Sequence, residues 1–154
     1  MVKRRTERIK SHLNISPSGS QATKVLHEAD DFETLYRIMG SLYLWPNSAA
    51  VAANAQMLCK CVLAIFPNGT NVQDTLVFSE VLDTDVPLQY IAEFDLEATI
   101  DGSKRKQFGT KWDFDIKAMR KMNKDDQVVL IFLGEATDYN FFLRGPINLW
   151  FKQA

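Results

Sequence analysis

Hydrophobic and polar positions alternate with a period of two along most of the chain after residue 21. Because successive side chains of a strand point to opposite faces, this period predicts half-buried strands rather than helices. The alternation or an apolar run predicts strands at 32–45, 56–66, 86–100, 106–116, 128–134 and 140–152. Eight or so strands with no convincing long helix are typical of an all-β protein, a two-sheet β-sandwich or barrel.

Some segments fit more than one conformation. Residues 74–83 suit a short helix and a strand, and the alanine-rich residues 48–54 suit a helical turn or a loop. Residues 119–127 are polar and are expected to form a turn. Asp101-Gly102 supplies a hairpin-type turn. Pro146 has no amide donor, which predicts a position at a sheet edge or a bulge.

The charge of the chain divides into two opposite parts. Residues 1–24 hold six Lys or Arg against one Asp or Glu, a charge of +5, while residues 25–154 hold twelve against eighteen, a charge of −6. A short cationic segment without apolar periodicity cannot fold alone, but it can neutralise phosphates in any geometry. We therefore predict a disordered basic arm and hinge over 1–21 and one folded domain over 22–154. The alternative is a solvated tail with no partner.

Eight basic residues are the predicted nucleic-acid-binding set, five in the arm and three after the Asp101-Gly102 turn: Lys3, Arg4, Arg5, Arg8, Lys10, Lys104, Arg105 and Lys106. A further basic cluster follows the strand of Trp112 and consists of Lys117, Arg120, Lys121 and Lys124. A solvated loop face explains each cluster of the body equally well. They extend a cationic surface only if the fold brings them to one side.

The sequence offers little for catalysis. The two histidines, His12 and His27, stand in no recognisable catalytic motif, so we predict no enzyme, no catalytic residue and no cofactor. Acid pairs two residues apart, such as Asp113 and Asp115, are typical of a solvated strand face. Asp83 and Asp85 are a weak candidate for calcium between subunits, and we predict no metal site.

The two cysteines, Cys59 and Cys61, lie in the apolar run QMLCKCVLAIF. A disulfide between strand residues two apart would be strained, and no second Cys pair or His cluster completes a zinc site. We therefore expect both to be buried as small hydrophobic residues. No apolar run approaches the roughly 18 residues that cross a bilayer, and no apolar signal core follows the basic start. We predict no membrane association and no secretion.

The order of segments resembles the small coat proteins of icosahedral viruses. The segments are the basic arm, a Ser/Gly hinge, TLYRIMGSLYLW with Arg37 three residues before Gly40, QMLCKCVLAIF, WDFDIKAMRKMNKDDQVVLIFLGEA and the closing LRGPINLWFK. The chain is most similar to coat proteins of small circular single-stranded DNA viruses, and next to those of plant satellite viruses. The arm is shorter and less arginine-rich than many coat-protein arms.

This resemblance implies a fold and a function. The fold is an eight-stranded jelly-roll β-sandwich with a flexible basic N-terminal arm. The function is that of a viral capsid protein, which self-assembles into an icosahedral shell of about 60 copies and binds packaged, single-stranded nucleic acid through its arm without base specificity. The expected location is the virion, and the interior of the host cell during assembly.

Two other functions remain open from the sequence. One is a β-sandwich binding module for a carbohydrate or a protein. The other is a viral matrix or single-strand-binding protein that uses residues 104–106 and aromatic platforms. Four aromatic residues at strand ends and loops are candidate anchors of subunit contacts: Trp45, Tyr90, Phe141 and Trp150. Arg37 and Arg144 lie in apolar strands and need a carboxylate or phosphate partner if they are buried.

Overall fold

The computed structural model describes residues 6–15, 21–46, 55–68, 89–101, 106–108, 110–134 and 141–153. These residues form nine strands: β1 (Thr6–Ile15), β2 (Gln21–Glu28), β3 (Glu33–Pro46), β4 (Ala55–Phe66), β5 (Gln89–Asp101), β6 (Lys106–Phe108), β7 (Thr110–Met122), β8 (Gln127–Gly134) and β9 (Phe141–Gln153). No helix occurs in these ranges, so none there is long and apolar enough to span a membrane. The all-β prediction is confirmed. The ambiguous segments 48–54 and 74–83 lie outside the described residues.

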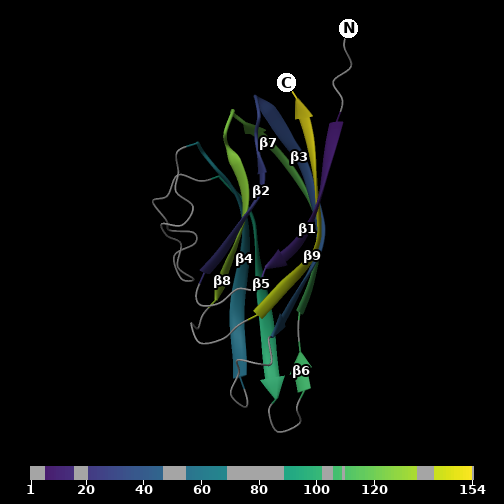
Figure 1. The fold of residues 1–154 in the computed structure, drawn as a ribbon, viewed down its shortest axis with the longest axis vertical. Helices are drawn as coiled ribbons and strands as arrows, with labels where there is room; N and C mark the ends of the chain where they lie inside the picture. Colours follow the sequence, from purple (N-terminus) through teal and green to yellow (C-terminus); the bar gives the residue numbers. More distant parts are fainter. Residues whose placement is uncertain are drawn as a thin grey trace.

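The strands form two antiparallel sheets that lie face to face (Figure 1). One sheet has four strands in the order β1-β9-β3-β7, and the other has five in the order β2-β8-β4-β5-β6. The predicted two-sheet sandwich is therefore confirmed. The described strands number nine: β1 and β2 were not among the expected ranges, and the single strand expected at 106–116 is divided between the sheets. Lys106–Phe108 pairs with β5, whereas Thr110–Met122 pairs with β3.

The core lies between the sheets and receives every second side chain of the inner strands. Its largest fully buried members include Phe132, Phe151, Leu35, Ile38 and Leu63. Burial of this apolar surface is the main term that stabilises the two-layer arrangement.

Three residues singled out in the sequence lie in this core. Cys59 and Cys61 are 1% and 0% exposed, which confirms their prediction as buried hydrophobic residues, and burial raises the pKa of the Cys61 thiol. Trp112 packs against Phe94 with ring centroids 3.5 Å apart. The Nε1 of Trp112 has no hydrogen-bond partner within the described part of the chain.

Strand β1 corrects the prediction of a disordered arm. Residues 6–15 pair with β9 over ten positions, from Thr6 opposite Lys152 to Ile15 opposite Leu143. The arm prediction is therefore wrong for these residues. An outer strand gives the backbone groups on one side of β9 their partners, and Ile9 takes a register position opposite the buried Leu149. Residues 1–5 and 16–20 lie outside the described part.

The turn after β7 is shorter than predicted. We expected a polar turn over 119–127, but β7 continues to Met122, whose side chain is fully buried. The apolar side chain at 122 extends the strand because it reaches the core. The turn itself is closed by Asp126, whose carboxylate accepts hydrogen bonds from the backbone amides of Asn123 at 2.8 Å and Asn68 at 3.1 Å.

Pro146 lies in the interior of a sheet, not at its edge, because β9 runs between β1 and β3. The β3–β9 ladder pairs Gly40 with Ile147 and next Tyr43 with Arg144, so it has a gap beside Pro146. Gly145, with a φ of 151°, lies in this gap. A Cβ atom there would lie 1.8 Å from the carbonyl oxygen of Ser41. The gap accommodates the missing amide donor of the proline within a central strand.

Candidate nucleic-acid interface

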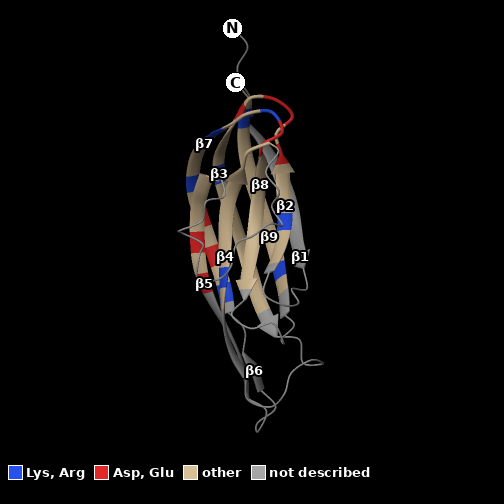
Figure 2. Ribbon diagram, turned by 90° about the vertical axis from the view of Figure 1, so that its left-hand side faces the viewer, with Lys and Arg blue, Asp and Glu red and all other residues tan. Residues whose placement is uncertain are grey.

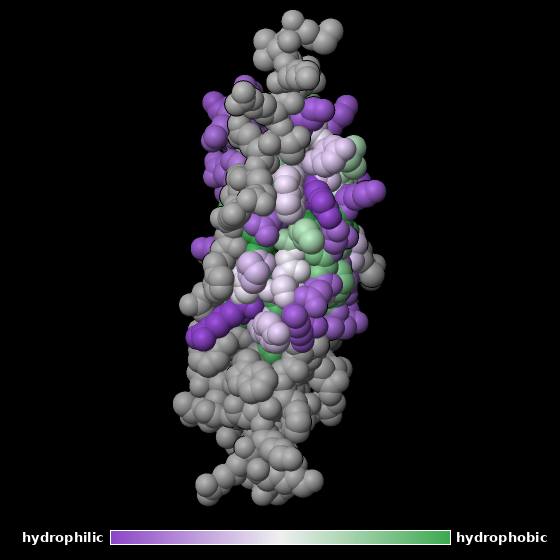
Figure 3. Space-filling model, turned by 90° about the vertical axis from the view of Figure 1, so that its right-hand side faces the viewer, coloured by the Kyte–Doolittle hydropathy of each residue, from purple (hydrophilic) through white to green (hydrophobic). Residues whose placement is uncertain are grey.

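The outer face of the four-stranded sheet gathers basic side chains from three described strands. Leu143, Ile147 and Leu149 of β9 point into the core, so the alternate residues of β9 face outward. The basic residues of this face are Arg37, Lys111, Lys117, Lys121, Arg144 and Lys152, and its carboxylates are Asp113 and Asp115. We call this surface the cationic face. Figure 3 shows it as a broad outer surface on which polar residues surround a paler, less polar centre.

One row of the cationic face is built around Arg37, which the register places opposite Lys117 on β7 and Trp150 on β9. The guanidinium holds the carboxylate of Asp115 with two hydrogen bonds, one from Nε at 2.6 Å and one from Nη2. The same guanidinium lies over the ring of Trp150, 5.3 Å from its centroid. The hydrogen bonds from Arg37 lower the pKa of Asp115, and they raise that of Arg37. Arg37 is therefore a charged group held in one geometry.

A second row lies toward the other end of the face, where Tyr43 pairs with Lys111 and Arg144. The Lys111 ammonium is 5.4 Å from the centre of the Tyr43 ring and 3.5 Å from the carboxylate of Asp113. Ser41 donates a hydrogen bond of 2.6 Å to the same carboxylate. The hydrogen bond from Ser41, and then the charge of Lys111, lower the pKa of Asp113. Cations therefore occupy both ends of the face, with two carboxylates between them.

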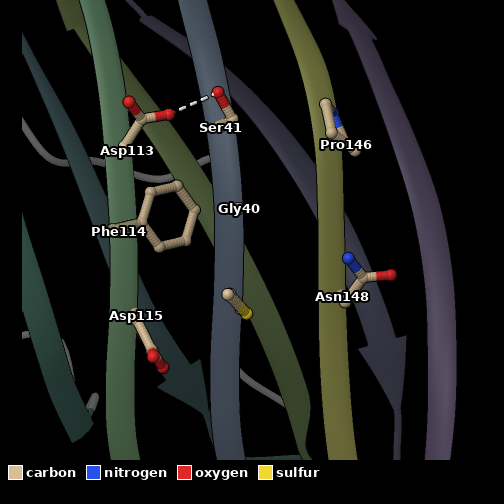
Figure 4. Close-up of a pocket in the computed structure, with 8 residues that line it drawn as sticks. Gly40, Ser41, Asp113, Phe114, Asp115, Pro146 and Asn148 are labelled. Carbon is tan, nitrogen blue, oxygen red and sulfur yellow. Dashed lines mark hydrogen bonds between the residues drawn. The ribbon is translucent and has the colours of Figure 1, made fainter.

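A hollow of about 450 Å³ lies between these rows (Figure 4). Its lining residues come from β3, β7 and β9 and are Met39, Gly40, Ser41, Asp113, Phe114, Asp115, Pro146 and Asn148. A Cβ atom on Gly40 would lie 2.5 Å from Cζ of Phe114 and 2.9 Å from the carbonyl oxygen of Pro146. The space beside Gly40 is therefore filled by the Phe114 ring, while carboxylate, hydroxyl and amide groups border the hollow.

The predicted binding residues are divided between the two sheets. Arg8 and Lys10 lie in β1, opposite Trp150 and Asn148 of β9, at register positions of the cationic face. Lys106 begins β6, the last strand of the five-stranded sheet. The structure therefore does not bring Lys106 to the two arm residues. The remaining members of the set, Lys3, Arg4, Arg5, Lys104 and Arg105, lie outside the described residues.

The second basic cluster of the sequence is also divided. Lys117 and Lys121 belong to the cationic face, whereas Arg120 donates a 3.4 Å hydrogen bond to the backbone carbonyl of Tyr90 on the other sheet. Lys124 is exposed in the turn after β7. Sequence reasoning did not assign Arg37 or Lys152 to a binding surface. Their signal was the alternation of each strand, which puts them outside the core once the sheet order is known.

The outer face of the five-stranded sheet is different in kind. Its centre is an apolar cluster separate from the core, with every member 0–2% exposed: Val62, Ala64 and Phe66 of β4, and Val129, Ile131 and Leu133 of β8. Figure 2 shows the central parts of β4 and β8 almost free of charged residues. On the β5 side, Lys60 lies 2.8 Å from the carboxylate of Glu93 and 3.8 Å from that of Asp95. This face is therefore apolar with an acidic border.

The remaining candidate for chemistry is the pair of His27 and Glu33, whose side chains are 15% and 5% exposed. His27 of β2, an outer strand of the five-stranded sheet, places its Nε2 2.5 Å from the carboxylate of Glu33, and its ring packs against Phe151 with centroids 4.1 Å apart. The pair connects β2 to the start of β3 across the core. No group of three or more His, Cys, Asp or Glu side chains that could hold a metal ion occurs among the described residues. The acids Asp83 and Asp85 are outside them.

Comparisons with known proteins give no family. No protein-family model and no curated protein sequence matches the chain. A chain from Desmodium yellow mottle tymovirus matches with a TM-score of 0.35 and 13% identity, covering 99% of this chain and 91% of its own length. A chain from infectious bursal disease virus, Gx strain, matches with a TM-score of 0.36 and 12% identity, covering 96% of this chain and 32% of its own length.

A further match is a chain of T=1 particles derived from infectious bursal virus, with a TM-score of 0.24 and 13% identity over 98% of this chain and 40% of that one. The protein spans only about a third of the length of the matched chain from the Gx strain. At TM-scores below 0.5, these matches establish no property of this protein. Any functional conclusion therefore depends on the strand order and on the chemistry of the two outer faces.

Proposed function

We propose that this protein is a viral capsid protein, a structural protein rather than an enzyme, whose two sheets form a jelly roll. The observation that carries this proposal is the strand order. The sheet β1-β9-β3-β7 lies against β2-β8-β4-β5, so the chain changes sheet at every step from β1 to β4 and again from β7 to β9. Viral capsid domains use this double-sheet jelly-roll arrangement, as do lectin domains and cupins, and the capsid alternative is the one that agrees with the basic arm. Strand β6 is then a short addition to the eight strands of the roll.

In this proposal, copies of the chain close into a small icosahedral shell of about 60 subunits, the location is the virion, and assembly takes place inside the host cell. The packaged single-stranded nucleic acid, DNA by the resemblance of the sequence, binds to the predicted basic set without base specificity. The set includes Arg8 and Lys10, which extend along β1. Of the predicted contact residues, Tyr90 is 38% exposed and remains a candidate.

The test is the size of the purified full chain, together with its ratio of absorbance at 260 and 280 nm. We expect a megadalton species that contains nucleic acid. A monomer of 17.6 kDa that is free of nucleic acid at both low and high salt would contradict the proposal. The arm is tested with the triple substitution K3Q/R4Q/R5Q, because a deletion beyond residue 5 removes part of β1. We expect this variant to fold, assemble and take up less nucleic acid.

A second candidate function is a binding module for a carbohydrate, which the hollow beside Gly40 favours. Two carboxylates, a hydroxyl and an amide border it, and these groups hydrogen-bond sugar hydroxyls well. A glycan array with the wild-type chain and the variant Asn148→Ala distinguishes the two functions. Specific binding of a glycan by a monomer, lost in the variant, would favour the module over the capsid protein.

A further inference from the structure

We propose that one end of the cationic face is a binding surface for single-stranded nucleic acid, which uses base stacking as well as charge. We call this surface the Trp150 belt, and its residues are Tyr36, Arg37, Lys117, Lys121, Trp150 and Lys152. The inference rests on the proposed function, which it deepens by adding to the arm a site on the folded domain. The two are nevertheless separable by experiment.

The belt consists of two adjoining rows that cross the four-stranded sheet. The first row runs from Lys117 through Arg37 to Trp150 and ends at the position of Arg8. Opposite residues of neighbouring strands lie on one face, and strands are about 4.8 Å apart, so a row over four strands is about 14 Å long. The second row lies beside the first and runs from Lys121 through Thr34 to Lys152. It ends at Thr6 of β1, which pairs with Lys152.

Charge makes the belt suitable for phosphates. It holds four basic side chains, those of Arg37, Lys117, Lys121 and Lys152, and the carboxylate in contact with it is Asp115. That carboxylate also orients Arg37. Lys117, Lys121 and Lys152 are exposed. On the opposite outer face, Lys60 is bound instead between two carboxylates. A polyanion is therefore attracted to the belt rather than to the other sheet.

Aromatic rings make the belt suitable for bases. A bulge between Leu35 and Arg37 interrupts the alternation of β3, so that Leu35 is buried while the next two residues, Tyr36 and Arg37, both lie outside the core. Tyr36 is 45% exposed, and the guanidinium plane of Arg37 already lies over Trp150. Bases of single strands stack on aromatic rings and on arginine planes. A duplex, whose bases are already stacked, gains nothing from this contact.

The belt is also continuous with the arm. Thr6 is the first residue of β1 and pairs with Lys152, so Arg5 is covalently attached at this end of the face. Lys3 and Arg4 precede it along the chain. The basic arm and the belt are therefore joined through Thr6, the described residue that pairs with Lys152.

The experiment compares two double variants with equal charge change in the full chain. K117E/K121E reverses the charge of two lysines of the belt. K24E/K124E reverses the charge of two lysines that are exposed outside the belt. The probe is a fluorescent oligothymidylate. We expect K117E/K121E to lose about tenfold in affinity and to lower the slope of log K against log salt by about 1.4, since each single-strand phosphate contact contributes about 0.7. The control should remain close to wild type.

Stacking is tested separately with Tyr36→Ala and the control Phe32→Ala, since the two aromatic residues are 45% and 44% exposed and Phe32 is outside the belt. We expect Tyr36→Ala to weaken binding of the oligothymidylate about tenfold and to leave binding of inorganic polyphosphate unchanged. A loss of polyphosphate binding equal to that of the oligonucleotide would overturn the stacking role.

The remaining outcomes distinguish a failure of the belt from a failure of the proposed capsid function. If K117E/K121E binds like K24E/K124E while K3Q/R4Q/R5Q still loses nucleic acid, the belt is wrong and the capsid function stands. If K117E/K121E fails to assemble in the absence of nucleic acid, the belt is a contact between copies of the chain, which also overturns the inference. Absence of binding by the wild-type chain would contradict the belt and the arm together.

Discussion

The two outer faces of the sandwich come from the same alternating pattern but have opposite characters. On the five-stranded sheet, outward residues such as Val62 and Ile131 are 0% exposed and form an apolar cluster. On the four-stranded sheet, outward residues such as Met39 and Tyr43 are 40% and 49% exposed among basic side chains. An outward position in a sandwich is therefore not necessarily a solvent position. One face contributes to the stability of the folded chain, while the other remains accessible to a partner.

A lysine placed on each face should show this difference most strongly. Ile131→Lys buries a charge in the apolar cluster, so we expect a loss of more than about 4 kcal/mol in the free energy of unfolding, or failure to fold. Met39→Lys, on the accessible face, should change it by no more than about 0.5 kcal/mol. Chemical denaturation of both variants measures the difference. Equal costs would show that the two faces do not differ in burial.

The glycines Gly40 and Gly145 of the four-stranded sheet provide the next test, because a Cβ atom at either position would meet neighbouring atoms rather than solvent. Gly145→Ala would bring Cβ against the Ser41 carbonyl at a φ of 151°, so we expect a loss of about 3 kcal/mol or more. Gly40→Ala would bring Cβ to 2.5 Å from the Phe114 ring and 2.9 Å from the Pro146 carbonyl oxygen, a less severe approach at an ordinary φ, and should cost about 1–3 kcal/mol. Thermal unfolding should rank Gly145→Ala below Gly40→Ala, and the reverse order would contradict the packing described here.

Lysines on the two faces should also differ in role. Lys60 is one-quarter exposed and lies 2.8 Å from the carboxylate of Glu93, so Lys60→Met should lower the free energy of unfolding by about 0.5–1 kcal/mol without affecting oligonucleotide binding. Lys117→Met should leave stability unchanged and weaken that binding. A binding loss in Lys60→Met equal to that in Lys117→Met would remove the distinction between a structural and a binding lysine.

The smallest effect concerns the pH dependence of the Arg37–Asp115 pair. Hydrogen bonds from Arg37 lower the pKa of Asp115 below its usual value of 3.8. A lowered carboxyl pKa stabilises the folded state above about pH 3.8, and this contribution is lost as pH falls through the folded-state pKa. In Arg37→Gln, the Asp115 carboxyl should titrate closer to 3.8 in an NMR titration. The neighbouring Asp113, held by Ser41, is the internal control and should titrate as in wild type.

Much of the sandwich could be predicted because its strands carry their own pattern. The alternation within residues 32–45 and 140–152 placed β3 and β9, and the apolar runs placed β4 and β8. The burial of Cys59 and Cys61 followed from the same runs. These features depend on neighbours in sequence, which is the information that periodicity contains.

The errors concern segments whose state depends on distant partners. The basic segment at the start of the chain has no pattern that predicts a strand, and β1 forms because β9, more than a hundred residues away, pairs with it. The candidate site was hidden for the same reason. Arg37 and Asp115 are 78 residues apart, and only the β3–β7 register brings them together. A single sequence contains the side chains of the cationic face but not the order of the strands that assemble it.

The pairing of Thr6 with Lys152 has a practical consequence for engineering the molecule. Because the beginning and the end of the fold are hydrogen-bonded neighbours, a short peptide linker could join them into a circular backbone, with new termini opened in a surface turn such as the one that holds Asn123.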